Sequence, residues 1–382
     1  MGAGVAVETR SWRRLMVANL APLTVLLAAA IGNRTFPDRY FLALQEDRFA
    51  EWLTFWSFMV AGVCFGVAAL RCWRYQSRSV WFLIGLSCFC LFVAGEEVSW
   101  GQRLLGFGSP EYFLAENFQQ EVNVHNVLPT GFRKWGLKVL ILGFGVVLPS
   151  MVLIGPVQSR LERWGVLLPP WEQIPSYLAM FLLYKIYPRK FSGEVVELKL
   201  GMGILLSTLS KGNRTGTVGT LPAMASVRRL ALTLSLITLL GVTSAAAAGR
   251  WFPEDPMKIE AARLETDALR ADLLQMARQE GELAAGKCGL HKRLFSFVEK
   301  YRKQQLQEGS FASIVREPSS SDRARYFIDP WNTPYWIRHS CGEGPGGSEV
   351  LVYSFGPNRM RDSGSGGIRG DDVGAVLVSS TH

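Results

Sequence analysis

The sequence RRLALTLSLITLLGVTSAAAAG, residues Arg228–Gly249, separates an apolar first part of the chain from a polar last part. Two interpretations fit this stretch. As a retained transmembrane helix, it has close to the ~20 residues that a bilayer span needs. As a signal sequence, it has a basic start, an apolar centre and a small-residue end at Ser244–Ala248 that a signal peptidase could cut. Both interpretations export the residues that follow.

The net positive charge of the chain comes entirely from its first part. The formal net charge is +9, but residues 250–382 contain 18 Lys or Arg and 18 Asp or Glu and are neutral. The whole surplus therefore lies among apolar segments, where basic loops set membrane topology. This distribution predicts membrane lipid as a partner and excludes nucleic acid.

The first part predicts a polytopic α-helical membrane domain. Four apolar segments have the length of spans: Leu15–Ile31, Trp52–Leu70, Val80–Gly95 and Gly136–Gly155. Two weaker, charged segments follow, Ile174–Tyr187 and Val195–Leu209, and they form either two spans or a re-entrant hairpin. With Arg228–Gly249 the total is five or seven spans. Either number, with basic loops inside, places the N-terminus in the cytoplasm and both loop Glu96–Lys134 and residues 250–382 outside.

Polar residues gather where the third span ends. The candidates for a polar membrane site are Glu96, Glu97, Gln102, Glu121, His125, Asn126, Glu194 and Glu197. Ionisable groups inside a membrane are expensive and are often functional, and carboxylates with a histidine could bind a divalent metal or pass protons. The alternative is structural: the acids lie at the water interface, paired with basic groups. The chain has no Ser/His/Asp triad, Walker loop or dinucleotide fingerprint, so we assign no catalytic residue.

This region resembles a family of uncharacterised bacterial multi-span membrane proteins. The matching segments are EE-x-SWGQR, here Glu96–Arg103, and N-x-Q-x-E-x-N-x-HN, here Asn117–Asn126. The resemblance covers about Leu15–Leu209 and implies a bacterial inner membrane, but it lends no activity. It indicates that the polar residues of both segments act as one unit.

The last part predicts a small α+β domain. Helices are expected at Glu254–Gly281 and Leu290–Gln305 from their apolar spacing. Four short strands separated by Gly- and Pro-rich turns follow, at Arg325–Ile328, Tyr335–Arg338, Val350–Phe355 and Ala375–Val378. Cys288 and Cys341 are the only cysteines here, and export would allow them to form a disulfide.

Three motifs of this domain resemble the C-terminal domain of the major pseudopilin of type II secretion systems. They are Asp329–Tyr335 (DPWNTPY), Tyr353–Asn358 (YSFGPN) and Gly370–Val373 (GDDV). In that family a DPWG turn leads into a hairpin, and a later loop binds calcium. The resemblance implies a calcium site, with candidate ligands Asn358, Asp362, Asp371 and Asp372.

The chain departs from the pseudopilin pattern in several places. Asn332 and Asn358 replace the usual Gly and Asp, and the calcium loop is longer and contains Arg359, Arg361 and Arg369. Arg228–Gly249 lacks the cleaved leader motif and the glutamate that pseudopilins use in assembly, so we do not expect polymerisation.

These observations predict three regions: a multi-span domain at 1–223, a last helix or signal-like segment at 224–249, and an exported pseudopilin-like domain at 250–382. The expected function is a structural or interaction role at the bacterial inner membrane, linked to type II secretion or pilus-like assembly. The alternative is an intramembrane enzyme or transporter built on the carboxylate and histidine residues. A third interpretation is that two reading frames were fused at Met224, because the sequence after it also fits the start of a secreted protein.

Overall fold

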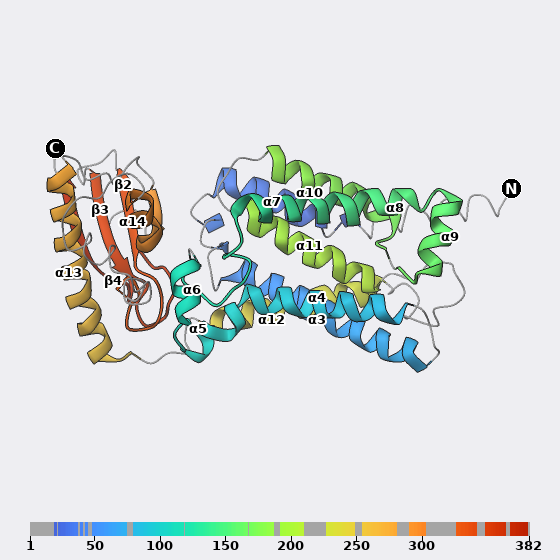
Figure 1. The fold of residues 1–382 in the computed structure, drawn as a ribbon, viewed down its shortest axis with the longest axis horizontal. Coiled ribbons are helices and arrows are strands. Elements are labelled where there is room, and N and C mark those ends of the chain that lie inside the picture. The colour runs from blue at the N-terminus through green and yellow to red at the C-terminus, as the bar shows by residue number, and fades with distance from the viewer. Residues whose placement is uncertain are drawn as a thin grey trace. The chain divides into compact units, whose positions relative to one another are not determined.

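The computed structural model describes residues 19–20, 22–36, 39–40, 43–44, 48–74, 79–117, 119–166, 168–186, 192–209, 227–248, 254–280, 290–302, 326–341, 348–363 and 367–380. Over these residues the chain is mostly helical, with a small sheet near its C-terminus (Figure 1). It forms two compact units, and each unit is made from two separate stretches of the chain. The first unit combines Met1–Val98 with Pro129–Ala245, and the second combines Ser99–Leu128 with Ala246–His382.

The first unit is helical wherever it has named elements. These are α3 (Phe49–Arg74), α4 (Val80–Glu97), α7 (Thr130–Val139), the π-helix η2 (Leu140–Val147), α8 (Leu148–Met151), α9 (Gly155–Arg163), the short η3 (Trp171–Gln173), α10 (Ile174–Ile186), α11 (Ser192–Leu209) and α12 (Val227–Ala248). Residues 22–31 of the first predicted span, Leu15–Ile31, are also helical, and this helix continues to residue 35. The helical character of the predicted apolar segments is therefore confirmed over the described residues.

Four helices of the described chain are long and apolar enough to cross a membrane. They are Phe49–Arg74, Val80–Glu97, Gly131–Met151 and Ala231–Ala248. The two weaker segments, α10 and α11, are not among them, because α10 has 13 residues and α11 carries three charged side chains. These four helices indicate a membrane protein.

Small residues bring the helices of the first unit close together. The Ser87 hydroxyl on α4 donates to the Gly62 carbonyl on α3 at 2.8 Å. A Cβ atom on Gly62 would lie 2.9 Å from the Leu91 side chain, and one on Gly201 of α11 would lie 3.0 Å from the Phe58 ring. Such small-residue contacts are typical of membrane helices, which associate by close packing because lipid offers no hydrophobic drive. Helix α3 therefore packs against both α4 and α11.

Helix α12, the segment that divides the sequence, packs against α3. Gly241 faces Leu53, since a Cβ atom there would lie 3.4 Å from the Leu53 side chain. One turn further on, the Trp56 indole donates to the Ser244 hydroxyl at 2.9 Å. Ile237 is buried in the same core. The packing of α12 is thus that of a membrane helix within the first unit.

The second unit contains a four-stranded antiparallel sheet in the order β1-β2-β3-β4. The strands are β1 (Leu290–Arg293), β2 (Trp336–Cys341), β3 (Ser348–Ser354) and β4 (Val373–Ser380). Its helices are α13 (Pro256–Glu280) and α14 (Leu294–Arg302), together with the short η1 (Ser99–Gly101), α5 (Gln102–Leu105) and α6 (Glu111–Glu116) from the other stretch. This is the small α+β arrangement that the sequence predicts.

The two faces of this sheet have different side chains. One face packs against α13 and α14 in a core that includes Leu273, Val298 and Ile337. Alternate residues point the other way, because successive side chains of a strand lie on opposite faces. On that second face Trp336 pairs in register with Tyr353, and Arg293 pairs with Trp336. The second face is thus aromatic and basic.

Two predictions about the second unit are wrong. The predicted helix Leu290–Gln305 begins with strand β1, and only α14 is helical, because Leu290–Arg293 pairs with the edge of β2. The predicted strand Arg325–Ile328 is a turn with one isolated bridge between Ile328 and Pro334 over its described residues. The other three strands and the helix at α13 are confirmed.

The division into units also differs from the predicted domains. Segment Ser99–Leu128, expected to belong to the membrane domain, lies in the same compact unit as residues 246–382. Between the two stretches the described chain has two candidate spans, Gly131–Met151 and Ala231–Ala248. Two crossings return the chain to the side of the membrane from which it started. The number of candidate spans is therefore consistent with both stretches belonging to one compact unit.

We therefore predict that segment Ser99–Leu128 and the C-terminal domain share one side of the membrane. Tyr112 and Met257 are 60% and 82% exposed and would carry single cysteines in a chain whose six native cysteines are replaced by serine or alanine. In intact spheroplasts a membrane-impermeant maleimide should label both positions. Labelling of only one position would contradict the shared unit, and labelling of neither position would place both on the cytoplasmic side of the membrane.

Candidate metal centre and polar clusters

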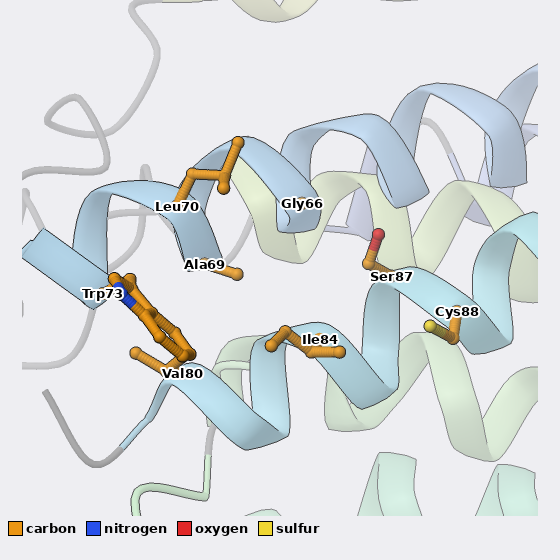
Figure 2. Close-up of a pocket in the computed structure, with 8 residues that line it drawn as sticks. All are labelled: Gly66, Ala69, Leu70, Trp73, Val80, Ile84, Ser87 and Cys88. Carbon is orange, nitrogen blue, oxygen red and sulfur yellow. The ribbon is translucent and has the colours of Figure 1, made fainter.

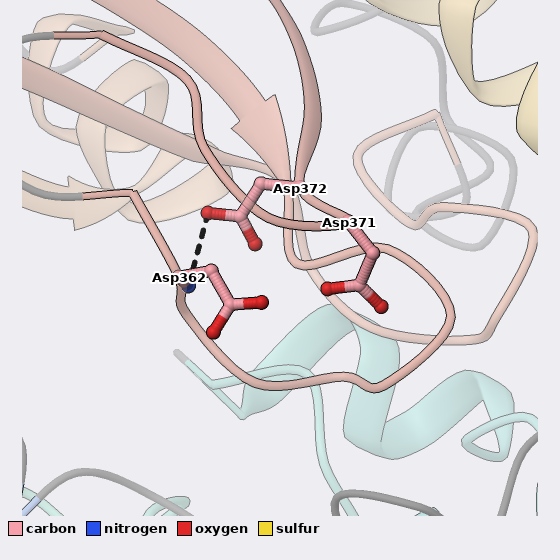
Figure 3. Close-up of side chains that lie close together, drawn as sticks. All are labelled: Asp362, Asp371 and Asp372. Atoms are coloured by element: carbon pink, nitrogen blue, oxygen red, sulfur yellow. Dashed lines mark hydrogen bonds between the residues drawn. The ribbon is translucent and has the colours of Figure 1, made fainter.

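Three aspartates of the second unit converge where a long loop meets strand β4. Ligand oxygens of Asp362, Asp371 and Asp372 all lie within 4.8 Å of one another (Figure 3). Among the described residues, this is the one group of three or more His, Cys, Asp or Glu side chains with such spacing. Carboxylates in a glycine-containing loop are the ligands that Ca²⁺ prefers.

Two glycines make this convergence sterically possible. Gly356 and Gly370 have φ values of 66° and 64°, a left-handed conformation that glycine adopts without strain. A Cβ atom on Gly356 would overlap the carbonyl oxygen of Asp371, and one on Gly370 would overlap the Asp362 carboxylate. Both glycines are therefore required for the close approach of the loop to itself.

One buried oxygen of the cluster has no hydrogen-bond partner. Oδ2 of Asp372 accepts from the backbone N–H groups of Asp362 and Ser363 at 3.2 and 2.6 Å. Oδ1 is buried without a hydrogen-bond partner in the described part of the chain. Figure 3 shows this oxygen pointing between the carboxylates of Asp362 and Asp371. A buried polar atom without a partner is costly, and a bound cation would satisfy it.

Asn358 joins the cluster as a donor. Its Nδ2 donates to carboxylate oxygens of Asp371 and Asp362 at 2.6 and 2.9 Å, while its Oδ1 accepts from the Met360 N–H at 2.6 Å. The sequence predicts Asn358 as a calcium ligand, which would require its oxygen to face the aspartates. In this geometry the three aspartates supply the oxygens, and Asn358 orders them.

The two buried arginines of the loop contact groups outside the aspartate cluster. The Arg361 Nε donates to the Ser363 carbonyl at 2.7 Å, and Arg361 also meets His291. An Nη of Arg359 lies 3.1 Å from where a Cβ atom on Gly106 would be. Arg369 is exposed. Arg359 thus contacts Gly106, and Arg361 contacts Ser363 and His291.

The clustering changes the acidity of the aspartates. Burial, followed by the neighbouring Asp362, raises the pKa of Asp371 to about 7. Burial raises the pKa of Asp372 to about 6, against the opposing effect of hydrogen bonds from Ser363. Both values exceed the ordinary range of a carboxyl group because negative charge is unfavourable here without a cation. A divalent ion would favour the charged forms.

A fourth aspartate has a structural role in the turn before β2. Asp329 is buried and accepts from the N–H groups of Trp331 and Thr333 at 3.0 and 2.7 Å. It also accepts from the Ser354 hydroxyl at the end of β3. Asp329 thus ties the turn to the strand that leads into the metal loop.

The predicted membrane site divides between the two units. In the first unit, Glu97 of α4 interacts electrostatically with Glu194 and Glu197 of α11 and with Glu96, as the sequence suggests. Two further members were not predicted: Glu51 of α3, and Arg133 of α7, which interacts with Glu197. Both lie near the starts of helices that are distant in sequence, and their spacing gives no signal of this electrostatic interaction.

Three of the remaining predicted residues, Gln102, Glu121 and Asn126, make hydrogen bonds within segment Ser99–Leu128. The Gln102 amide accepts from the Val122 N–H at 2.7 Å and donates to the Ser109 hydroxyl at 2.8 Å. Asn126 donates to the Gln119 side chain. Glu121 is 4% exposed and accepts from the Ser99 hydroxyl at 2.9 Å. His125 is half-buried. These contacts are structural.

One buried lysine of the first unit was not identified from the sequence as a candidate site residue. The Lys199 side chain on α11 is fully buried and donates to the Ser176 hydroxyl at 3.1 Å. Its ammonium group lies 4.0 Å from the centre of the Tyr177 ring. Among the described residues no acid forms an ion pair with it. The Ser176 hydroxyl and the Tyr177 ring together stabilise the buried ammonium group of Lys199.

An apolar groove lies between α3 and α4. Figure 2 shows it lined by Gly66, Ala69, Leu70, Trp73, Val80, Ile84, Ser87 and Cys88. The lining offers almost no polar atoms, and both helices are candidate spans. In a bilayer, lipid tails would fill such a groove. The predicted disulfide between Cys288 and Cys341 lies outside the described residues, because Cys288 is not among them.

The raised pKa values predict that calcium stabilises the second unit more at high pH. Without the ion, folded Asp371 and Asp372 keep protons that the unfolded chain releases above about pH 4, so stability falls as the pH rises from about 4 to about 7 and levels off above that. Calcium binds the deprotonated forms. The increase in melting temperature with calcium should therefore be larger at pH 8 than at pH 5.5.

The measurement is thermal unfolding of the full chain with and without calcium across this range. Asp329 has a pKa raised to about 6 by burial, but it titrates in both samples and cancels in the difference. A calcium increment that does not change with pH would contradict the prediction.

Comparisons with protein-family profiles, with curated proteins and with solved structures give no match. The resemblances drawn from short motifs therefore stay expectations. What supports a function is the geometry of the two clusters: an aspartate centre in the second unit and a carboxylate group in the first.

Proposed function

We propose that this chain is a bacterial inner-membrane protein whose extracytoplasmic, pseudopilin-like domain binds calcium and has a structural or interaction role, in type II secretion or pilus-like assembly. The observation that carries the proposal is the buried Oδ1 of Asp372, which has no partner in the described chain and points between two other carboxylates. Calcium bound there would join the end of the loop to the start of β4.

The order of the motifs along the domain supports this assignment. The turn that Asp329 organises precedes β2, the loop with Gly356 follows β3, and Asp371 and Asp372 precede β4. This is the sequence of turn, hairpin and calcium loop that the resemblance implies. The absence of an acidic residue in α12 favours an anchored interaction domain over a polymerising subunit.

We expect Asp372→Asn to abolish or strongly weaken calcium binding. An amide keeps the shape of the side chain but supplies one oxygen and no charge, so the dissociation constant should rise at least about tenfold, equivalent to ~1.4 kcal/mol. The measurement is isothermal titration of the purified full chain in detergent with calcium chloride, and with magnesium chloride for comparison.

The matched control is Asp267→Asn, which makes the same chemical change at an exposed position on α13. It should leave calcium binding unchanged. If the unmodified chain binds no calcium at millimolar concentration, or if both variants bind equally well, the proposed calcium centre is wrong.

A second function has its own support in the first unit. Glu97 meets acids from two other helices, Glu51 on α3 and Glu194 and Glu197 on α11. Carboxylates brought together near the end of a membrane helix are suited to bind and pass protons or divalent cations. The alternative function is therefore a transporter or intramembrane enzyme that uses this group.

The test of the alternative is proton flux in reconstituted vesicles that contain a pH-sensitive dye. Glu97→Gln removes the central ionisable carboxyl group and should lower the flux about tenfold or more, while Glu111→Gln, an exposed acid on α6, should leave it unchanged. A flux no greater than that of protein-free vesicles would rule out proton transport by the unmodified chain.

A further inference from the structure

Segment Ser99–Leu128 is folded by its own hydrogen bonds. The Asn117 side chain donates to the Asn123 side chain at 2.8 Å and to the carbonyl oxygen of Glu121. The Gln102 amide closes the segment at the other end through the Val122 N–H. The polar residues of the two membrane-family motifs thus build a defined surface between two spans.

This surface makes an ion pair with the C-terminal domain that is almost completely buried. An oxygen of Glu121 lies 3.2 Å from Nη2 of Arg293 on β1, and both side chains are 5% exposed. The Arg293 guanidinium also lies 5.0 Å from the centre of the Trp336 ring. Neither charge would be tolerated in this environment without the other, because a buried charge without a partner is strongly destabilising.

An apolar contact accompanies the ion pair. Leu114 of α6 is 4% exposed and belongs to the same core as Leu273 of α13, Phe295 of α14 and Ile337 of β2. A residue from the segment between two spans therefore completes the hydrophobic core of a domain that begins more than a hundred residues later.

Two positions that depart from the pseudopilin pattern face the segment as well. Asn332, in a left-handed conformation with φ of 63°, donates from its side chain to the Gly106 carbonyl at 3.0 Å. The guanidinium of Arg359 lies against the same glycine. A glycine at 332 would fit the turn equally well, but it could not make the side-chain contact.

We propose that Ser99–Leu128 is a receptor for the C-terminal domain and holds it by these contacts independently of the covalent connection through α12. The partner is the domain itself, recognised by charge at Arg293, by an apolar site for Leu114 and by the amide of Asn332. Cleavage at Ser244–Ala248 would then leave the domain bound to the membrane. This inference does not depend on calcium.

The test separates the covalent connection from the contacts. A site for a sequence-specific protease is placed between Ala248 and Glu254 of the full chain, and membranes opened by sonication are cut and sedimented. The unmodified contact surface should keep most of the domain in the pellet, in moderate salt, because buried ion pairs are screened little.

The variants locate the retention in the ion pair. With Arg293→Glu, the amount of domain released into the supernatant after cutting should be at least tenfold greater than with the unmodified chain. Glu121→Arg should have the same effect without changing the domain's own sequence. The double variant should restore retention at least in part. The control is Arg263→Glu, which breaks the exposed pair of Arg263 with Glu260 on α13 and should have no effect.

Release of the unmodified domain on cutting would overturn the proposal, as would retention that survives Glu121→Arg together with Leu114→Ser. Because both of these substitutions lie in the segment, the released domain keeps its native sequence, and its protease resistance shows whether it is still folded. Calcium titration of the released domain reports on the calcium centre separately, so failure of one proposal does not imply failure of the other.

Discussion

The buried pair of Glu121 and Arg293 is the interaction on which the organisation of this chain depends. Two ionised groups that are each 5% exposed must be brought together by the fold. They are 172 residues apart in sequence, and four candidate spans flank or separate them. The pair therefore requires both stretches to lie on one side of the membrane and to fold as one unit. It also favours a single gene product, because two unrelated reading frames fused at Met224 would not share a buried charge pair and a core.

Local patterns predicted the helices well and the sites only partly. The apolar runs identified α3, α4 and α12 because the composition of a span dominates its structure. The resemblance to the pseudopilin motifs named Asp362, Asp371 and Asp372, and these three side chains do lie together in the structure because they belong to one loop. Strand β1 was missed because its four residues pair with a strand that begins more than forty residues later. Glu121 was expected at a membrane site because its partner Arg293 lies beyond the reach of any spacing rule.

The two polar clusters solve the same electrostatic problem differently. In the second unit, the charges of Glu121 and Arg293 neutralise each other, and the aspartate centre is left with an excess of oxygen ligands. In the first unit, Lys199 is stabilised by a hydroxyl and a ring, whereas Glu97 faces other acids. A buried polar atom without a hydrogen-bond partner is costly, and among these groups the Oδ1 atom of Asp372 is such an atom in the described part of the chain. Asp372 is therefore the residue that most directly indicates binding.

The order in which the second unit is assembled also affects its synthesis. A ribosome adding roughly 5 to 20 residues each second needs on the order of ten to thirty-five seconds to proceed from Glu121 to Arg293. During that interval the Glu121 carboxylate has not yet met Arg293 and the Leu114 side chain has not yet met the rest of its core, while two further membrane segments are still being inserted. The segment between α4 and α7 must therefore remain soluble as an unfinished half of a domain. Its internal hydrogen bonds, from Gln102 to Asn126, satisfy polar groups of the segment before the C-terminal domain has been synthesised.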